Sequence, residues 1–303
     1  MNKIAAIIIK YSKNKKFNLK KIHSIQQQVD KIFIIDNSPK EACYRKNKKI
    51  DYFFLGENYG IAYAQNFGIF QALKNFYTHC ILVDQDTSFE KNYIKQAIKI
   101  YKTNKNITAI APNLFDQNKK IELGLVKRFF LFKKNINSLY EKKKNIVNIL
   151  KKTTSITYIT ETMSSGTIIK LKDISTVGFM NDDLFLDWVD FEWCWRLRKY
   201  KKFIVGLSEI FAFHHLGSSK IKFLFKIYHT HSLLRYCYIL RNGIALSLYS
   251  SSAPISWKIN IFVNTVRYFL GSIILNKFNQ NQVVILLKAL KEGFLCRGGK
   301  IKI

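Results

Sequence analysis

Apolar and polar positions follow two different rhythms along the first half of the chain. Short, nearly continuous apolar runs, which are typical of buried strands, alternate with longer segments in which apolar residues recur every three or four positions, as in helices. The strand-like runs are Ile4–Ile9, Lys31–Ile35, Tyr52–Leu55, Cys80–Val83 and Ile107–Ala111, and the helix-like segments are Phe17–Val29, Ile61–Phe76 and a third that ends near Tyr101. This alternation predicts an α/β fold, with a largely parallel sheet covered by helices on both faces.

The second half of the chain is less regular. The segment 127–152 is basic, rich in Asn and weakly patterned, and we interpret it as an excursion over the surface. Regular patterns then return, with strand-like runs at Ser155–Thr162, Gly166–Leu171 and Phe203–Leu207 and a helix over Trp188–Tyr200. These patterns predict that the sheet continues beyond the excursion.

After Gly217 the strand-like patterns end, which predicts an α/β domain over residues 1–217 and a helical C-terminal extension over residues 218–303. Apolar stripes at helical spacing cover Ile259–Ile274 and Val283–Phe294, with basic residues beside them. Such helices dock on their own domain or, with basic flanks, lie on an anionic membrane surface, and both readings stay open. No apolar stretch reaches the roughly 18 residues that a membrane span needs.

The chain has 303 residues and is strongly basic, with 50 Lys and Arg against 20 Asp and Glu and a formal net charge of +30. Such a charge attracts nucleic acid, anionic lipid or phosphorylated substrates. The basic residues are scattered along the whole chain, and neither a zinc pattern nor an RNP-like aromatic motif is present. A non-catalytic protein that binds polyanions through charge is therefore the alternative class, and we expect no specific nucleic-acid partner.

The five cysteines are widely spaced and form no CxxC pair. This spacing argues against a disulfide framework or a thiolate metal site and fits a reducing compartment. The N-terminal apolar run, Ile4–Ile9, is too short for a signal peptide and is followed at once by polar and basic residues. We therefore expect a cytoplasmic protein, and the reading in which the C-terminal helices bind anionic lipid would add peripheral contact with the inner membrane.

Asp84-Gln85-Asp86 directly follows a strand-like run. Ligands of α/β sheets bind at the carboxyl ends of the strands, so both carboxylates are placed where a ligand would lie. A divalent cation that bridges them to a pyrophosphate would relieve their mutual repulsion. The structural alternative is a polar turn in which Asp86 or Thr87 caps the next helix.

Two further polar clusters point to the same edge. Asp36 ends a strand-like run and begins a turn, where its carboxylate could accept a hydrogen bond from the imide N–H of a uracil or thymine ring or form an Asx turn. Asn58 and Gly60 make a tight entry to the next helix, whose small residues allow close packing on the sheet or on a ligand.

The order of these segments resembles the nucleotide-binding half of family 2 glycosyltransferases with the GT-A fold, in particular the bacterial rhamnosyltransferase branch, whose metal motif often reads DQD. Each motif alone is weak, but their order along residues 4–245 is specific for the family. The motifs are IIDNSP at 34–39, NYGIAYAQNFGI at 58–69, LVDQDT at 82–87, SGTII at 165–169, FLDWVDFEWCWR at 185–196, HHLG at 214–217 and RN at 241–242.

The resemblance implies a metal-dependent, inverting glycosyltransferase with a mixed GT-A sheet and a C-terminal helical extension. By its branch, the donor would be dTDP-rhamnose, and the acceptor a lipopolysaccharide, O-antigen or other surface polysaccharide, presented as a glycan or on a lipid. A UDP-hexose or UDP-N-acetylhexosamine donor is the alternative within the same fold.

The resemblance also implies roles for single residues. Asp190 would be the catalytic base; the family often has Glu-Asp here, whereas this chain has Val189-Asp190, and Asp187, one helical turn earlier, is the reserve candidate. Glu192 and Arg196 are spaced i,i+4, and we interpret them as a structural ion pair.

The implied cofactor is Mn²⁺ or Mg²⁺. Asp86 would bind it, with Asp84 at the ribose or a second metal position, and His214 would hold the metal or pyrophosphate, with His215 as the alternative register. For Trp188 and Trp193, which the resemblance places at the sugar or acceptor, the alternative is packing in the core. The other implied contacts are Asp36, Asn58, Gly60, Asn66 and Asp84 for the nucleotide, and Ser165, Gly166, Trp188 and Trp193 for the sugar or acceptor.

Overall fold

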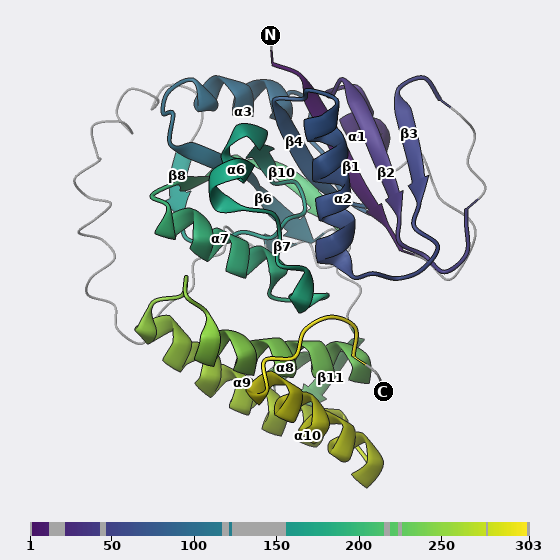
Figure 1. Ribbon diagram of the computed structural model, residues 1–303, viewed down its shortest axis with the longest axis vertical. Helices are drawn as coiled ribbons and strands as arrows, with labels where there is room; N and C mark the ends of the chain where they lie inside the picture. The colour runs from purple at the N-terminus through teal and green to yellow at the C-terminus, as the bar shows by residue number, and fades with distance from the viewer. Residues whose placement is uncertain are drawn as a thin grey trace.

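The structure is a computed structural model that describes residues 2–11, 22–42, 47–116, 121–122, 156–214, 219–223, 226–276 and 278–301. A large α/β unit contains the main sheet, and three long helices form a separate layer below it (Figure 1). The predicted excursion at 127–152 and the first part of the helix predicted over Phe17–Val29 lie outside the described residues.

The first half of the sheet is parallel, as the strand-like runs predicted. Its strands are ordered β3-β2-β1-β4, and the register of each pair is parallel. These strands are β1 (Ile4–Lys10), β2 (Lys31–Asp36), β3 (Ile50–Phe54) and β4 (His79–Asp84). Buried apolar residues make β1, β2 and β4 nearly continuous hydrophobic runs, which is typical of parallel strands covered on both faces, whereas β3 at the end of the sheet is mostly half-buried.

The second half makes the sheet mixed. The short strand β9 lies antiparallel between β4 and β6, while β10 pairs parallel with β6 and antiparallel with β5 and β8. The reversal at β9 brings the turn before this strand to the same edge as the carboxyl end of β4. These strands are β5 (Ser88–Phe89), β6 (Ile107–Asp116), β7 (Ile121–Glu122), β8 (Ile156–Ile159), β9 (Ile168–Lys170) and β10 (Phe203–His214).

Two apolar cores lie on the two faces of the sheet. Alternate residues of β1 enter different cores, with Ile7 in one and Ile8 in the other, because successive side chains of a strand point to opposite faces. Figure 1 shows α2, α6 and α7 on one face of the sheet. The helices and short turns of this unit are α1 (His23–Gln26), α2 (Ile61–Lys74), α3 (Tyr93–Tyr101), η2 (Leu171–Asp173), α6 (Ile174–Val177), η3 (Asp182–Leu184) and α7 (Val189–Lys199).

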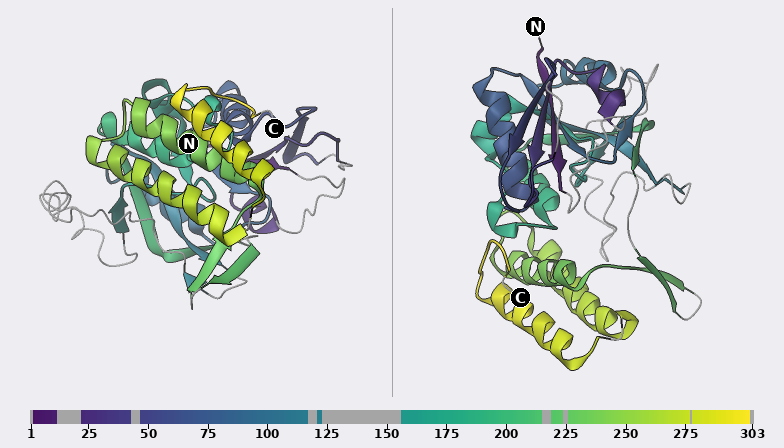
Figure 2. Two further views of the ribbon diagram at one scale, coloured as in Figure 1. Left: turned by 90° about the horizontal axis from the view of Figure 1, so that it is seen from below. Right: turned by 90° about the vertical axis from the view of Figure 1, so that its right-hand side faces the viewer.

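The C-terminal region contains a hairpin as well as helices, so the prediction that strands end at Gly217 is wrong. β11 (Ser219–Phe223) pairs antiparallel with β12 (Lys226–Thr230), and Figure 2 shows the hairpin standing away from the helices. The sequence SKIKF alternates basic and apolar residues with the period of a strand, a signal too short to be recognised. The helices are α8 (Leu233–Tyr249), α9 (Ile255–Asn276) and α10 (Gln280–Phe294).

Helix α9 keeps one apolar stripe on the surface. Its buried side includes Trp257 and Ile261, whereas the stripe on the opposite side is largely solvent-exposed. Within the described part of the chain, no helix combines the length and the apolar character needed to span a bilayer. The stripe consists of Ile255, Ile259, Phe262, Val266, Leu270 and Ile274, spaced three or four residues apart.

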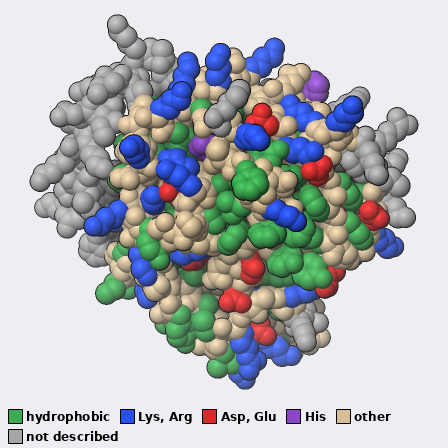
Figure 3. Space-filling view, turned by 45° about the horizontal axis from the view of Figure 1, so that its top comes forward, with side chains coloured by type: hydrophobic (Ala, Val, Ile, Leu, Met, Phe, Trp, Pro, Cys, Tyr) green, Lys and Arg blue, Asp and Glu red, His purple; other side chains and the backbone are tan. Residues whose placement is uncertain are grey.

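The described basic side chains are dispersed over the one face of the molecule that Figure 3 presents. On the face shown in Figure 3, Lys and Arg side chains are spread among acidic and hydrophobic ones and do not gather in a single stripe. A nucleic-acid interface concentrates its positive charge on one face or helix. On this face the described Lys and Arg side chains show no such concentration.

Candidate active site

The sheet brings several predicted residues to one edge. Asp36 ends β2 beside Lys10 of β1, and Asp84 ends the neighbouring strand β4. The turn before the antiparallel strand β9 is tied to the end of β4, because the Gly166 N–H donates to the Leu82 carbonyl at 2.7 Å. Residues far apart in sequence thus share the carboxyl edge, where ligands of such sheets bind.

The Asp84-Gln85-Asp86 segment forms a turn at this edge. The Thr87 N–H donates to the Asp84 carbonyl at 3.1 Å, and the hydroxyl oxygens of Thr87 and Ser165 lie 2.7 Å apart. The N-cap of the following helix α3 is Asn92. Neither Asp86 nor Thr87 caps that helix, so the capping alternative for this motif is wrong.

The chemistry of the turn fits a hard divalent cation. Mg²⁺ and similar ions take carboxylate oxygens and complete their shell with water and substrate phosphates. Among the side chains that the structure describes, no three His, Cys, Asp or Glu residues converge on a preformed metal site. His214 ends β10, but its side chain and the whole of His215 lie outside the described residues. The choice between these histidines stays a prediction.

Asp190 lies in the first turn of α7 and is partly buried. The pKa of its carboxyl is raised to about 6, mainly because the group is buried. The Ser164 N–H, which donates to Oδ2 at 3.0 Å, lowers this pKa and offsets part of the effect of burial. The negative charges of Asp84 and Asp187 raise this pKa further. A carboxyl with this pKa is ionised at neutral pH and still basic enough to accept a proton in a transition state.

Asp187 has a different environment, because Arg235 of α8 holds its carboxylate. The guanidinium Nη2 lies 2.9 Å from Oδ1, and Nε lies 3.1 Å from Oδ2. The bidentate guanidinium engages both oxygens of this carboxylate and fixes its orientation toward α8. The geometry therefore favours Asp190 over the reserve candidate Asp187.

Asp36 is fully buried in a network that the sequence did not indicate. Lys10 Nζ lies 3.0 Å from both carboxylate oxygens, and the Ser38 N–H and the Tyr52 hydroxyl also donate to the carboxylate. Burial alone would raise the pKa of Asp36, but the hydrogen bonds from Ser38, Tyr52 and Lys10 outweigh it and hold this pKa below its usual value. A nucleobase could reach this carboxylate only by displacing one of these donors, so the predicted base contact stays a prediction.

Asn58 and Gly60 shape the entry to α2. The Asn58 side-chain oxygen accepts from the Gly60 N–H at 2.9 Å and from the Asn37 amide at 3.1 Å. Gly60 has φ +88°, and a β-carbon there would lie 2.6 Å from the Phe185 carbonyl oxygen. Only glycine fits, because the backbone is left-handed and the chain before Asp190 passes directly against it.

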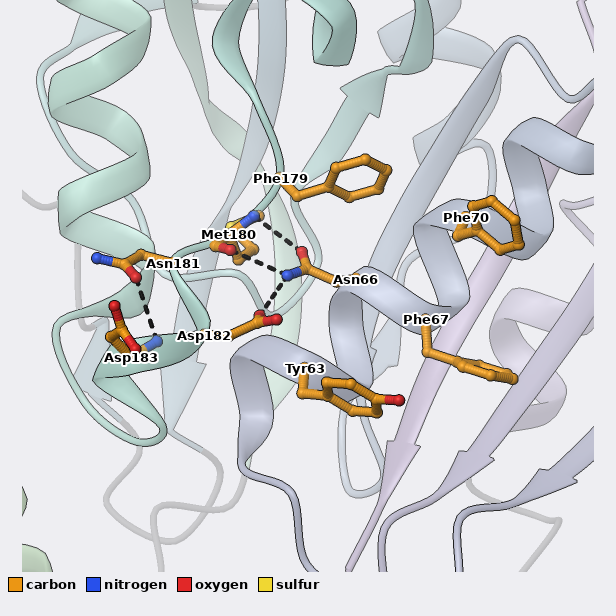
Figure 4. Close-up of a pocket in the computed structure, with 9 residues that line it drawn as sticks. All are labelled: Tyr63, Asn66, Phe67, Phe70, Phe179, Met180, Asn181, Asp182 and Asp183. Carbon is orange, nitrogen blue, oxygen red and sulfur yellow. Dashed lines mark hydrogen bonds between the residues drawn. The ribbon is translucent and has the colours of Figure 1, made fainter. Parts of the chain in front are cut away.

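Asn66 lies on the outer side of α2, where its amide is engaged by protein groups (Figure 4). It donates to the Met180 carbonyl at 2.9 Å and to the Asp182 carboxylate, and it accepts from the Met180 N–H at 2.8 Å. The open groove around it measures about 460 Å³ and is lined partly by aromatic rings, including Tyr63 and Phe70. In the described structure Asn66 holds the 180–182 segment, and its predicted nucleotide contact stays a prediction.

The two tryptophans occupy different positions. Trp188 is partly buried at the N-cap of α7, and its indole N–H donates to the Ile239 carbonyl at 3.1 Å. Trp193 is 2% exposed, with its indole N–H donating to the Gly178 carbonyl at 3.1 Å. Trp193 therefore packs in the core and cannot offer its face to a sugar in this conformation, as the packing alternative supposed.

The predicted structural pair on α7 is present. Arg196 Nε lies 2.9 Å from a Glu192 carboxylate oxygen, one helical turn away. Sequence reasoning missed Lys10 and Arg235, which hold Asp36 and Asp187. A lysine at the end of an otherwise apolar strand was a usable signal for Lys10, whereas Arg235 had no local signal, because its partner lies 48 residues earlier.

The mixed α/β sheet, with helices on its faces and a helical C-terminal region, is that of the GT-A fold of glycosyltransferases. Residues 6–166, more than half of the chain, match the family model described as glycosyl transferase family 2. The protein therefore belongs to glycosyltransferase family 2. It is similar to the dTDP-rhamnosyl transferase RfbF of Shigella flexneri, with 29% identity over 246 residues that cover 80% of this chain and 79% of that protein.

Solved structures share the fold. TarS residues 1–349 of S. aureus, in complex with UDP-GlcNAc, superposes with a TM-score of 0.58 at 14% identity and covers 97% of this chain and 81% of its own. GalNAc-T7 with UDP, GalNAc and Mn²⁺ superposes with a TM-score of 0.53 at 11% identity, over 88% of this chain. This chain spans 54%, about half, of GalNAc-T7.

Proposed function

We propose that this glycosyltransferase is metal-dependent and inverting, and that it transfers rhamnose from dTDP-rhamnose to a lipopolysaccharide, O-antigen or other surface-polysaccharide acceptor. The observation that carries the proposal is the position of Asp190. Its carboxyl has a pKa of about 6, raised by burial and further by the nearby Asp84 and Asp187 charges, and it lies at the edge that carries the Asp84-Gln85-Asp86 turn. In this proposal, a carboxyl suited to act as base and a turn suited to bind an anionic leaving group would lie at the same edge.

In this mechanism Asp190 accepts the proton of the acceptor hydroxyl as the oxygen attacks the anomeric carbon from the side opposite the leaving nucleotide. The Ser164 N–H keeps the Asp190 carboxylate in position. Asp86 and Asp84 would hold Mn²⁺ or Mg²⁺, with His214 completing the set. The cation, when bound, neutralises charge on the leaving diphosphate. Support comes from the chemistry of the turn and from GalNAc-T7, which was solved with UDP and Mn²⁺.

The donor rests on the similarity to RfbF, which is named a dTDP-rhamnosyl transferase. A UDP-hexose or UDP-N-acetylhexosamine is the second candidate, because TarS of the same fold was solved with UDP-GlcNAc. Calorimetry with dTDP and UDP, each with and without Mn²⁺, separates them. We expect metal-dependent binding with dTDP preferred. A preference for UDP would keep the enzyme and change the sugar, whereas no metal-dependent binding of either would contradict the donor site.

The exposed apolar stripe of α9 would bring the enzyme to its acceptor by contacting the membrane. Seen from below in Figure 2, α8, α9 and α10 lie side by side, and the stripe of α9 adds exposed apolar side chains beside Lys258 and Arg267. Exposed apolar patches of this kind mark interaction sites, and basic flanks favour anionic lipid. The protein would lie against the cytoplasmic face of the inner membrane, where a lipid-linked glycan is within reach.

Vesicle sedimentation tests this contact. Wild-type protein should bind vesicles containing anionic lipid more strongly than purely zwitterionic ones. Replacing Ile259 and Leu270 by Ser should weaken vesicle binding by at least about tenfold, because each methylene withdrawn from the lipid costs roughly 0.8 kcal/mol. Phe76→Ser is the matched control, because Phe76 is 84% exposed and lies outside α9. Equal binding by wild type and the stripe variant would refute the membrane contact.

A further inference from the structure

The segment Asp183–Trp188, here called the catalytic loop, leads directly into the first turn of α7 and Asp190. Three of its residues have left-handed backbone conformations, Phe185 with φ +59°, Asp187 with φ +59° and Trp188 with φ +69°. Non-glycine residues in this region cost of order 1–3 kcal/mol each, and such conformations persist only where surrounding contacts enforce them. The contacts that enforce this loop come largely from the C-terminal unit.

One face of helix α8 is directed at the catalytic loop. Arg235, Tyr238, Ile239 and Asn242 are spaced i, i+3, i+4 and i+7, which places them on one side of a helix. The Tyr238 ring stacks on Phe185 with centroids 5.0 Å apart and planes 8° apart. The Ile239 carbonyl accepts from the Trp188 indole at 3.1 Å.

Asn242 makes the largest number of backbone contacts with the loop. Its buried side-chain amide donates to the carbonyls of Leu184 at 2.8 Å, Leu186 at 2.8 Å and Asp187 at 3.2 Å. Three carbonyls that converge on one amide group define a tightly curved backbone. The same amide oxygen accepts from Arg241 Nε at 2.9 Å, which sets the orientation of the amide.

Arg241 extends this contact along the loop and to the end of the chain. Its Nη2 donates to the Asp183 and Leu184 carbonyls at 2.9 and 3.1 Å, and its Nη1 donates to the Gly299 carbonyl. The Gly299 N–H in turn donates to the Asp183 carbonyl at 2.8 Å. The loop is therefore enclosed by two separate segments of the C-terminal unit.

The nucleotide side of the enzyme holds the loop from the opposite direction. The Ile61 N–H at the start of α2 donates to the Phe185 carbonyl at 2.7 Å, and Gly60 allows this close approach. The catalytic loop thus lies between α2 and α8, and its course depends on both.

We propose that Arg235, Arg241 and Asn242 are positioning residues of the active site, which impose the course of the catalytic loop and thereby aim Asp190. This inference rests on the proposed role of Asp190. It makes the C-terminal unit part of the catalytic apparatus, in addition to any membrane contact. The loop's left-handed residues gain nothing locally from their conformation, whereas the three α8 side chains satisfy its carbonyls and the Asp187 charge only in that conformation.

Three variants test the role in the full-length chain: Asn242→Ala, Arg235→Ala and Arg235→Lys. A displacement of the base by about 1 Å can cost about 10²-fold in rate, so we expect kcat to fall about tenfold to a hundredfold for the two alanine variants. Arg235→Lys should recover part of the loss, because it retains the charge but not the bidentate geometry. The affinity for nucleotide with Mn²⁺ should change less than about twofold, which separates positioning from donor binding.

A control variant and a second measurement distinguish a loss of positioning from a general loss of stability. Asn264→Ala removes the same side chain as Asn242→Ala from helix α9, where Asn264 donates to Asn260 and not to the catalytic loop, and should leave kcat unchanged. Amide hydrogen exchange of the catalytic loop should increase in Asn242→Ala while melting temperature and exchange of the sheet stay near wild type. Arg235→Ala covers the case in which Asn242→Ala does not fold, since Arg235 is half-exposed.

The outcomes are separable. Wild-type kcat and unchanged loop exchange in Asn242→Ala and Arg235→Ala would overturn the positioning role. A parallel loss of kcat, nucleotide affinity and melting temperature would also overturn it, in favour of a purely structural role. If wild-type protein itself transferred no sugar, the proposed function would fail, whereas the loop exchange would still report whether α8 holds the loop.

Discussion

Replacing Asp190 by Asn should abolish sugar transfer while the protein still binds nucleotide. General-base catalysis contributes about 10²–10⁴-fold to a rate, so kcat is expected to fall by about 10³-fold. An amide cannot accept the proton of the acceptor hydroxyl, but it can still accept the Ser164 N–H that orients residue 190. Nucleotide affinity with Mn²⁺, measured by calorimetry, should stay close to wild type, because the base faces the acceptor.

The pH dependence supplies an independent check on this residue. In wild type, kcat/KM should fall as the pH drops below about 6, because the pKa of Asp190 is raised to about 6, by burial first and by the Asp84 and Asp187 charges.

The same pKa shift of Asp190 affects the stability of the fold. The folded state binds this proton more tightly than the unfolded state, so the contribution of Asp190 to stability decreases as the pH rises from about 4 to about 6. Asp190→Asn should therefore be at least as stable as wild type at pH 7.

Two neighbouring carboxylates provide the controls. Glu192→Gln, in the structural pair with Arg196 at 2.9 Å, should retain near-normal kcat. Asp187→Asn should reduce kcat only in part, because it disturbs the Arg235 contact without removing the base. Near-normal turnover of Asp190→Asn together with an inactive Asp187→Asn would transfer the role of base to Asp187.

Replacing Asp86 by Ala should remove the metal dependence of nucleotide binding. Asp86 lies in the turn that follows β4, and its loss leaves a single carboxylate of the pair. Changes around a metal site typically cost 10–100-fold in metal affinity, and loss of a direct ligand should cost at least about this much. Calorimetric titration with nucleotide should then give the same weak affinity with and without Mn²⁺.

A surface aspartate serves as the matched control for this variant. Asp51 on β3 pairs with Lys31 at 2.8 Å and is half-exposed, so Asp51→Ala removes an equal charge away from the carboxyl edge. Its metal-dependent affinity should match wild type. If Asp86→Ala retained full metal-dependent affinity, Asp86 would not be a metal ligand, and Asp84 with the histidines at 214 and 215 would have to be tested instead.

The parallel half of the fold could be predicted from the sequence because its signal is local. Continuous apolar runs such as Ile4–Ile9 have no amphipathic alternative and must be buried on both faces, so they specify strands of a covered sheet. The polar residues at their ends, Asp36 and Asp84, were then placed at one edge by topology alone. The family followed from the order of the motifs, and the match over residues 6–166 confirmed it.

Features that depend on partners distant in sequence could not be predicted in this way. The carboxylate of Asp36 is occupied by Lys10 and Tyr52, and although a lysine at the end of an apolar strand marks Lys10 as unusual, its own segment does not indicate which residue it pairs with. The hairpin at Ser219–Thr230 was missed because two five-residue strands carry too little periodic signal. Trp193 and Trp188 look equivalent in sequence, and only packing shows that the first belongs to the core.

The sequence by itself determined the sheet, the family and the set of acidic residues that could carry the chemistry, because strand burial and motif order are written in consecutive residues. The tertiary structure decided the surroundings of the two candidate acids. Asp187 is neutralised by Arg235 from a helix that begins 46 residues later, whereas Asp190 is left in a partly buried site with Ser164. A pKa depends on burial and on every charge nearby, and those are properties of the folded chain.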